Sequence, residues 1–355
     1  MAKKVVVGMS GGVDSSVAAY LLKEQGYDVI GVTMQFWQEE GNESCGGTHA
    51  AEDAQRVAKM LDIPFYVLDF QKEFKCKVVD YFTDEYLQGR TPNPCNACNR
   101  FMKWEALLEH AKELGADYIA TGHYARIDRL PNGRYAICNS VTAAKDQTYA
   151  LYRLTQEQLS HTLMPIGEYA KDEIRQIAEK IGLPVANKPD SQDICFIPDG
   201  DYGAFLERMV PDKLPGEGNF VDLTGKVLGK HKGITHYTIG QRKGLNLAMG
   251  HPVFVAAIRP DTNEVVIGED ADIRGNVVYC DQINYMGMED LPEPRRAVVK
   301  IRYAHAGTPC LLEKLPDGRV KCTFDENVRA ATPGQSAVFY EDGYVLGGGT
   351  ICVDN

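Results

Sequence analysis

The feature that most constrains this chain is a glycine-rich turn between an apolar run and a helical pattern near the N-terminus. Lys4–Gly8 is valine-rich, as a buried strand would be, and the turn that follows reads Gly-Met-Ser-Gly-Gly-Val-Asp-Ser-Ser. From Ser15 to Gln25 apolar residues recur at helical spacing, and Gly26 is a natural helix end. A strand joined to a helix by so short a turn predicts the start of a parallel α/β sheet.

The same alternation continues to about residue 123. It predicts strands at Val29–Met34, Phe65–Leu68 and Tyr118–Thr121, and helices at Ala50–Leu61, Val78–Leu87 and Trp104–Leu114. Such alternation indicates a parallel sheet with helices on both faces. Because ligands bind at the carboxyl ends of the strands in these sheets, we expect the glycine turn to form part of a ligand site.

The pattern changes further along the chain. Tyr124–Asp128 and Arg134–Cys138 flank Pro-Asn-Gly, which predicts a hairpin, and Glu168–Ile181 has the pattern of an amphipathic helix. From about Gly216 the chain has short strands and glycine turns, as in small β-barrels. The prediction is an α/β parallel-sheet domain over residues 1–204, a small β-rich central domain over 205–277 and a C-terminal β-barrel over 278–355.

The glycine turn has the chemistry of a phosphate site. Adjacent glycines let the backbone approach an anion, and the helix N-terminus offers N–H groups. The turn lacks the Gly-Lys-Ser/Thr of a Walker loop and the glycine spacing of a dinucleotide site. An ordinary capped turn is the alternative. The turn resembles the pyrophosphatase-type loop of ATP-dependent adenylating enzymes, which include amidotransferases, tRNA lysidine synthases and tRNA thiolases.

Two cysteines stand in motif-like surroundings. Cys98 lies in Thr91–Asn99, whose two prolines predict a stiff loop, and it precedes a helix predicted to begin near Phe101. The helix N-terminus is therefore expected to lower the pKa of its thiol. Cys195 lies within Ser191–Ile197, which reads SQDICFI. Cys95 and Cys98 form the one close pair among ten cysteines, and close pairs favour metal or redox chemistry.

Taken together, these motifs resemble those of the bacterial tRNA-specific 2-thiouridylases, which thiolate the wobble uridine of certain tRNAs. The matching segments cover nearly the whole chain and are Gly8–Ser15, Gly89–Asn99, Thr121–Arg126, Lys145–Gln147, Ser191–Ile197, Gly240–Gly244, Thr332–Tyr340 and Leu346–Gly349. The resemblance implies an adenine-nucleotide α-hydrolase-like domain, a small central domain and a C-terminal β-barrel that binds tRNA. This agrees with the pattern along the chain.

The resemblance also implies roles for individual residues. Cys98 would be the nucleophile, and Cys195 would carry a persulfide. The ATP-binding residues would be Gly8, Met9, Ser10, Gly11, Gly12, Val13, Asp14, Ser15, Met34 and Gly122. The target base would lie against Asn93, Pro94 and Cys95. The tRNA would contact Lys145, Asp146, Gln147, Arg302 and Tyr303.

The implied reaction has two stages. ATP would bind with Mg²⁺, and the C2 oxygen of the uridine would be adenylated with release of diphosphate. Cys195 would carry a persulfide supplied by a sulfur donor protein such as a cysteine desulfurase or a sulfur-relay protein. Its terminal sulfur would then displace AMP, either directly or after Cys98 has released it as hydrosulfide. The cycle would end in a Cys98–Cys195 disulfide that a reductant must open.

Cys95 departs from the family pattern, because relatives often have an acidic residue at this position. The thiol relay is therefore weighed against a second arrangement, in which Cys95, Cys98 and Cys195 hold an iron–sulfur cluster with one open iron site. Two further function classes stay open. An amide-forming adenylating synthetase would need no reactive cysteine, and a non-catalytic RNA-binding module would leave the glycine turn unexplained.

The charge of the chain bears on its partners. The formal net charge of −11 disfavours a nucleic-acid binder on the total alone, although local patches matter more. One basic cluster, either an RNA-binding surface or a merely solvated one, comprises Arg295, Arg296, Lys300 and Arg302. No apolar stretch approaches the length of a membrane span, and no signal peptide precedes the first strand, so we expect a cytoplasmic protein without a membrane partner.

Overall fold

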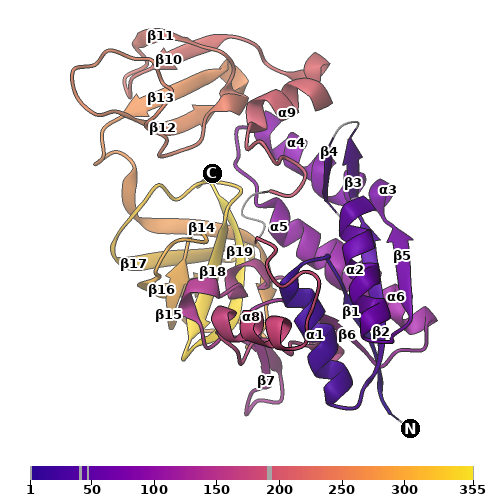
Figure 1. The fold of residues 1–355 in the computed structure, drawn as a ribbon. Coiled ribbons are helices and arrows are strands. Elements are labelled where there is room, and N and C mark those ends of the chain that lie inside the picture. Colours follow the sequence, from indigo (N-terminus) through magenta and orange to yellow (C-terminus); the bar gives the residue numbers. More distant parts are fainter. Residues whose placement is uncertain (1, 40–41, 46–47, 190–193, 355) are drawn as a thin grey trace.

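The computed structural model describes residues 2–39, 42–45, 48–189 and 194–354, and it has three successive units (Figure 1). A parallel sheet covered by helices is followed by a small sheet and then by a closed barrel. The fold class predicted from the sequence is confirmed. Within the motif Ser191–Ile197, residues 191–193 lie outside the described residues.

The N-terminal sheet is parallel, with the strand order β5-β2-β1-β6-β9. Its strands are β1 (Lys4–Gly8), β2 (Asp28–Gln35), β5 (Phe65–Asp69), β6 (Tyr118–Thr121) and β9 (Thr162–Leu163). The chain leaves β1 towards β2 and β5, and it later adds β6 on the other side of β1. The order therefore reverses between β1 and β6, and the loops after these two strands flank the point where ligands bind in such sheets.

Successive residues of β1 face opposite sides of the sheet, and each side has its own apolar core. Val5 and Val7 pack with α1 (Val13–Glu24), α2 (Thr48–Met60) and α8 (Lys171–Lys180). Val6 packs on the other side with η2 (Cys98–Ala106) and α6 (Leu107–Glu113). Because both faces are buried, β1 is apolar at every position between its ends.

Two helical stretches begin earlier than the pattern predicts. One runs from Gln71 rather than Val78, through α3 (Gln71–Phe74), η1 (Lys75–Val79) and α4 (Asp80–Leu87). The other runs from Pro94 rather than Trp104, through α5 (Pro94–Ala97) and η2 into α6. The interpretation of Pro94 as part of a stiff loop is wrong, because its fixed φ and missing N–H suit the first position of a helix.

The predicted hairpin is present, but it belongs to the sheet of the C-terminal barrel. It consists of β7 (Arg126–Arg129) and β8 (Tyr135–Cys138), and β8 pairs with β19 (Tyr344–Cys352). The barrel closes because β14 pairs with both β17 and β19. Besides β19, the strands of the barrel are β14 (Arg274–Tyr285), β15 (Arg295–Lys300), β16 (Thr308–Lys314), β17 (Val320–Arg329) and β18 (Ser336–Glu341).

The middle unit follows α9 (Tyr202–Met209) and has a small core around Phe220, Val255 and Val265. Its strands β10 (Gly218–Val221), β11 (Val227–His231), β12 (Phe254–Arg259) and β13 (Glu264–Gly268) form one sheet in the order β11-β10-β13-β12. Short elements elsewhere include β3 (Trp37–Glu39), β4 (Asn42–Cys45) and α7 (Gln156–Ser160). In the described part of the chain, no helix combines the length and the apolar character needed to cross a membrane.

Candidate active site

The glycine turn lies at the switch point and is shaped by hydrogen bonds within the loop. The backbone N–H of Ser10 donates to Ser15 Oγ at 3.1 Å, and the two hydroxyl oxygens lie 3.2 Å apart. Gly11 has a φ of +68°, and a Cβ there would collide with the carbonyl of Ala50, so only glycine fits. The first-turn amides of α1 have no intrahelical acceptor and can face an anion.

Gly122 closes the other side of the switch point. A Cβ on Gly122 would lie 2.5 Å from the backbone nitrogen of Ser15, so the end of β6 and the first turn of α1 meet backbone to backbone. Met34, near the end of β2, reaches towards Gly8, where a Cβ would lie 3.5 Å from its terminal methyl carbon. The segments predicted to bind ATP therefore converge, while the individual contacts with the nucleotide stay predictions.

Two lysines that the sequence analysis did not single out flank this loop. The Nζ atom of Lys171, at the start of α8, lies 2.8 Å from each carboxylate oxygen of Asp14, and the Tyr124 hydroxyl donates to Asp14 Oδ1 at 2.7 Å. Lys188 Nζ donates to the carbonyl of Gly11 at 3.1 Å. Lys188 Nζ also lies 2.7 Å from Asp53 Oδ2, so both ammonium groups have an acidic partner, and both lie where phosphates are expected. They come from distant segments, so no local pattern marks them.

Cys98 lies inside a helix rather than in front of one. The Asn93 side chain caps this helix by accepting from the backbone N–H groups of Cys95 at 3.1 Å and Asn96 at 3.3 Å. Cys98 is the fifth residue of a continuous helical stretch that begins at Pro94. The helix dipole is most effective within the first turn, and Cys98 lies beyond it. The expectation that the helix lowers the pKa of Cys98 is wrong.

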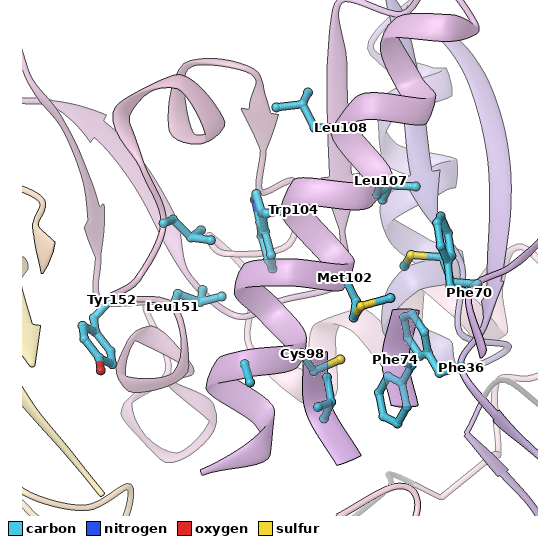
Figure 2. Close-up of a cluster of buried hydrophobic side chains, with 14 of the residues drawn as sticks. Phe36, Phe70, Phe74, Cys98, Met102, Trp104, Leu107, Leu108, Leu151 and Tyr152 are labelled. Atoms are coloured by element: carbon cyan, nitrogen blue, oxygen red, sulfur yellow. The ribbon is translucent and has the colours of Figure 1, made fainter. Parts of the chain in front are cut away.

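Burial decides the acidity of Cys98 instead. The residue is 8% exposed, and the loss of hydration raises the pKa of its thiol to about 12. The positive charge of Lys103 opposes this rise, whereas the nearby thiols of Cys195 and Cys95 add to it. Cys195 packs against the apolar cluster that contains Cys98. Figure 2 shows Cys98 on the same helical stretch as Met102, within the apolar cluster on this face of the sheet.

The helical stretch that carries Cys98 lies against the nucleotide end of the site, because the ring centroids of Trp104 and His123 are 5.2 Å apart. Burial lowers the pKa of His123 well below its usual value, and the charge of Lys103 lowers it further. His123 directly follows Gly122, and its Nδ1 lies 2.7 Å from Thr121 Oγ1. Lys103 therefore acts on both Cys98 and the end of β6. A lysine five positions after Cys98 is the signal in the sequence that could have identified it.

The arrangement of the thiols also bears on metal binding. Within the described residues, no group of three or more His, Cys, Asp or Glu side chains is placed to hold a metal ion. Cys95 is exposed and Cys98 is buried, so these thiols do not present a common set of ligands with Cys195. The residues do not fit an iron–sulfur cluster in this arrangement, and we derive no step through one.

The predicted tRNA contacts lie next to the predicted base contact. Tyr303, just after β15, donates through its hydroxyl to the carbonyl of Asp146 at 3.1 Å, and its ring packs edge-on against Tyr149. Burial raises the pKa of Tyr303, and Asp146 and Cys95 contribute through their charges. The structure therefore brings the segment around Asp146, the barrel residue Tyr303 and the Cys95 helix together. Their contacts with tRNA stay predictions.

Asp146 and Gln147 have partners inside the protein. The Asp146 carboxylate accepts from the backbone N–H of Ser140 at 3.0 Å and of Thr148 at 3.1 Å. Gln147 Oε1 accepts from the backbone N–H of Tyr124 at 2.8 Å. These bonds shape the loop next to the phosphate site, and neighbouring Lys145 is half-buried there.

The late arginine cluster is partly neutralised. Arg295 pairs with Glu341, and Arg296 binds both carboxylate oxygens of Asp325 at 2.7 and 2.9 Å. Arg302 donates to a backbone carbonyl at 2.9 Å and has no acidic partner within the described chain. Of these three arginines, Arg302 is therefore the one whose charge is available to a phosphate.

Comparison with known proteins gives a family for each unit. Residues 3–199 match the family model described as tRNA methyl transferase HUP domain. Residues 203–269 match the tRNA methyl transferase PRC-barrel domain, and residues 276–351 match the Aminomethyltransferase beta-barrel domain. The domain boundaries predicted from the sequence stay predictions.

Similar proteins match over almost the full chain and carry one name, tRNA-specific 2-thiouridylase MnmA. The relative from Lachnoclostridium phytofermentans is 60% identical over 98% of this chain and 99% of its own. A relative from Clostridium perfringens is 57% identical over 98% of both chains. A relative from Clostridium kluyveri is 54% identical over 99% of both chains. The chain therefore belongs to the tRNA-specific 2-thiouridylase family.

Proposed function

We propose that this chain is a tRNA-uridine 2-sulfurtransferase, which converts the wobble uridine of tRNA to 2-thiouridine and releases AMP and diphosphate. The observation that carries the proposal is the packing of Cys98 and Cys195 in one apolar cluster, on a helical stretch whose Trp104 lies against His123 at the nucleotide end of the site. The names of relatives at 54–60% identity support it. An adenylating loop activates an oxygen, and thiols supply sulfur, so their combination suits thiolation.

The first step is adenylation of the base. The C2 oxygen of uridine attacks the α-phosphorus of ATP, and the bond to the diphosphate breaks. The loop amides and the ammonium groups of Lys171 and Lys188 stabilise the negative charge of the phosphates. Mg²⁺ would neutralise phosphate charge, and Asp14 suits it because Mg²⁺ sites combine one or two carboxylates with substrate phosphates.

The second step replaces oxygen by sulfur. The terminal sulfur of a persulfide on Cys195 attacks C2, and the C2–O bond to AMP breaks. The Cys98 thiolate then attacks the Sγ atom of Cys195, which releases 2-thiouridine and leaves a Cys98–Cys195 disulfide. In the other order, Cys98 first releases hydrosulfide from the persulfide, and the hydrosulfide attacks C2. Both orders end in the same disulfide, which a thiol reductant reopens.

The raised pKa of Cys98 suits a residue that must wait for its substrate. A protonated thiol is a poor nucleophile, so Cys98 would not consume the persulfide before tRNA binds. Lys103 supplies the positive charge that favours the thiolate once the proton is lost. The buried position of Cys98 thus separates formation of the persulfide on Cys195 from its later cleavage by Cys98.

Recognition of tRNA is proposed to involve both ends of the chain. The target base must leave its stacked position to reach Asn93, Pro94 and Cys95. Lys145, Asp146 and Gln147 would meet the tRNA from one side, and Arg302 and Tyr303 from the barrel. A sulfur donor protein, either a cysteine desulfurase or a sulfur-relay protein, would load Cys195. We propose that the reaction takes place in the cytoplasm, where tRNA and ATP are both present.

The test is a thiolation assay on unmodified tRNA with ATP, a thiol reductant and either sulfide or a persulfide-loaded donor protein, with metal-free and iron-loaded protein purified without oxygen. Product from metal-free protein with the donor protein supports the thiol relay. Product from iron-loaded protein alone supports a cluster on Cys95, Cys98 and Cys195. An amide-forming synthetase is supported if the protein still turns over ATP with a small acid as acceptor after all its thiols have been alkylated. Binding of tRNA without ATP turnover supports an RNA-binding module.

The relay itself is tested by replacing Cys195 with serine. This variant should lose thiolation with the donor protein but keep tRNA-dependent release of diphosphate from ATP, because adenylation precedes sulfur transfer. A variant that still thiolates tRNA with the donor protein contradicts the relay.

A further inference from the structure

The helical stretch that begins at Pro94 and carries Cys95 and Cys98, called the cysteine helix below, is held in place by a turn of the C-terminal barrel. The backbone N–H of Thr91 donates to the carbonyl of Pro333 at 2.9 Å. In return, Gln335 Nε2 donates to the carbonyl of Thr91 at 2.9 Å and to that of Pro92 at 3.2 Å. One carboxamide therefore holds two consecutive carbonyls directly before Asn93, the residue that caps the cysteine helix.

The contact is close enough to require glycine at its centre. Gly334 has a φ of +90°, and a Cβ there would lie 2.9 Å from the carbonyl oxygen of Thr91 and 3.0 Å from its backbone nitrogen. The turn Pro333–Ser336 thus lies directly against the backbone of Thr91. Little freedom of movement remains between the barrel and the start of the cysteine helix.

A second contact lies on the helix, between Cys95 and Cys98. Asn96 Nδ2 donates to Ser336 Oγ at 2.7 Å, and Ser336 Oγ donates to the Tyr152 hydroxyl at 3.1 Å. The Tyr149 hydroxyl donates to the Ser336 carbonyl at 2.8 Å. Asn96 and Ser336 are 3% and 4% exposed. Buried polar networks of this kind specify one arrangement, because an unmade bond leaves a desolvated group unpaired.

We propose that the turn Pro333–Ser336 completes the active site, with Gln335 and Ser336 as positioning residues for the helix that carries Cys95 and Cys98. The inference rests on the proposed function. The barrel, which would contact tRNA through Arg302 and Tyr303, also holds the cysteine helix. The target base and Cys98 then share one rigid frame, so the barrel sets the position from which the Cys98 thiolate attacks the Sγ atom of Cys195.

A matched control is available on another part of the same interface. Gln156 Nε2 donates to the carbonyl of Tyr135 at 2.8 Å and to the carbonyl of Met286 at 3.1 Å, ahead of the barrel strand β15. Like Gln335, it is a half-buried glutamine whose carboxamide holds two carbonyls. Gln156→Ala therefore reports the cost of loosening the interface without loosening the cysteine helix.

The experiment compares Gln335→Ala, Gln335→Glu and Gln156→Ala in the full chain, with tRNA transcript, ATP, reductant and a cysteine desulfurase with cysteine, which loads the persulfide onto Cys195. Gln335→Glu keeps the shape of the side chain but cannot donate to carbonyls. We expect both Gln335 variants to lower kcat for thiolation by about 10- to 100-fold, because a misplacement near 1 Å has an effect of that size. KM for tRNA and ATP should stay within about threefold, and Gln156→Ala should keep kcat within about twofold.

Alkylation of Cys98 by iodoacetamide gives a second reading that does not depend on activity. Release of the helix should expose Cys98 and speed its alkylation in the Gln335 variants but not in Gln156→Ala. The inference is overturned if kcat of the Gln335 variants is unchanged or falls no further than kcat of Gln156→Ala. A rise in KM for tRNA at unchanged kcat overturns it as well. If wild-type protein does not thiolate tRNA, the proposed function fails, and unchanged alkylation of Cys98 would then overturn the positioning role.

Discussion

Gly122 is the position where one added methyl group should most directly disturb the phosphate loop. A Cβ there would lie 2.5 Å from the backbone nitrogen of Ser15, 2.7 Å from the carbonyl carbon of Asp14 and 2.9 Å from Ser15 Cα, whereas ordinary contacts begin near 3.4 Å. All three atoms belong to the backbone of the first turn of α1, so no side chain can move aside. Gly122→Ala must displace this turn from β6 by about 1 Å.

A shift of this size moves the amides that would hold the phosphates. Misplacement by 1 Å lowers rates by about 100-fold, and overpacking costs about 1–3 kcal/mol of unfolding free energy. The assay is tRNA-dependent release of diphosphate from ATP, with thermal unfolding measured in parallel. Gly275→Ala is the control, because a Cβ there meets no heavy atom within 4 Å. A folded Gly122→Ala protein that keeps its rate within about twofold would refute the reasoning.

Three further predictions concern charge. With a pKa of about 12, Cys98 carries a thiolate in about one molecule in ten thousand at pH 8. Iodoacetamide should therefore label exposed Cys95 first, and the labelling rate of Cys98 should rise about tenfold for each added pH unit. Equal labelling of the two cysteines at pH 8, measured by mass spectrometry, contradicts the burial argument. Lys171→Met removes the ammonium group beside Asp14 and should raise KM for ATP by roughly tenfold, whereas Lys171→Arg should keep most of the affinity. An unchanged KM for ATP in Lys171→Met, measured by steady-state kinetics, would mean that this lysine does not contribute to nucleotide binding. Arg302→Ala should reduce the slope of log Kd for tRNA against log salt by about 1, and an unchanged slope in filter binding would mean that Arg302 contacts no phosphate.

The phosphate loop was predictable because its determinants are local. A strand, two adjacent glycines and a helix start are consecutive in the sequence, and the hydrogen bonds among Ser10, Gly12, Ser15 and Ser16 join residues at most five positions apart. The parallel sheet followed from the same short-range alternation. The contact between Gly122 and Ser15 could be predicted only from the order of the strands in the sheet, and no local sequence pattern gives that order.

The cysteine helix was mispredicted for two physical reasons. Pro94 is compatible with both a loop and the first position of a helix, and the cap from Asn93, with the packing behind it, selects the helix. The acidity of Cys98 depends on its hydration, which tertiary packing removes. A helix dipole, the one effect visible in the sequence, acts too weakly beyond the first turn to offset burial.

The sequence by itself determined the fold class, the phosphate loop and the identity of the candidate thiols, because each depends on residues that are close along the chain or on motifs in a particular order. Only the tertiary structure decided which side chains share the site. It brought Lys171 to Asp14, set Trp104 against His123, and placed Gln335 of the barrel against the start of the cysteine helix. Contacts of this kind join residues far apart in sequence, and they form when burial of apolar surface drives separate segments together.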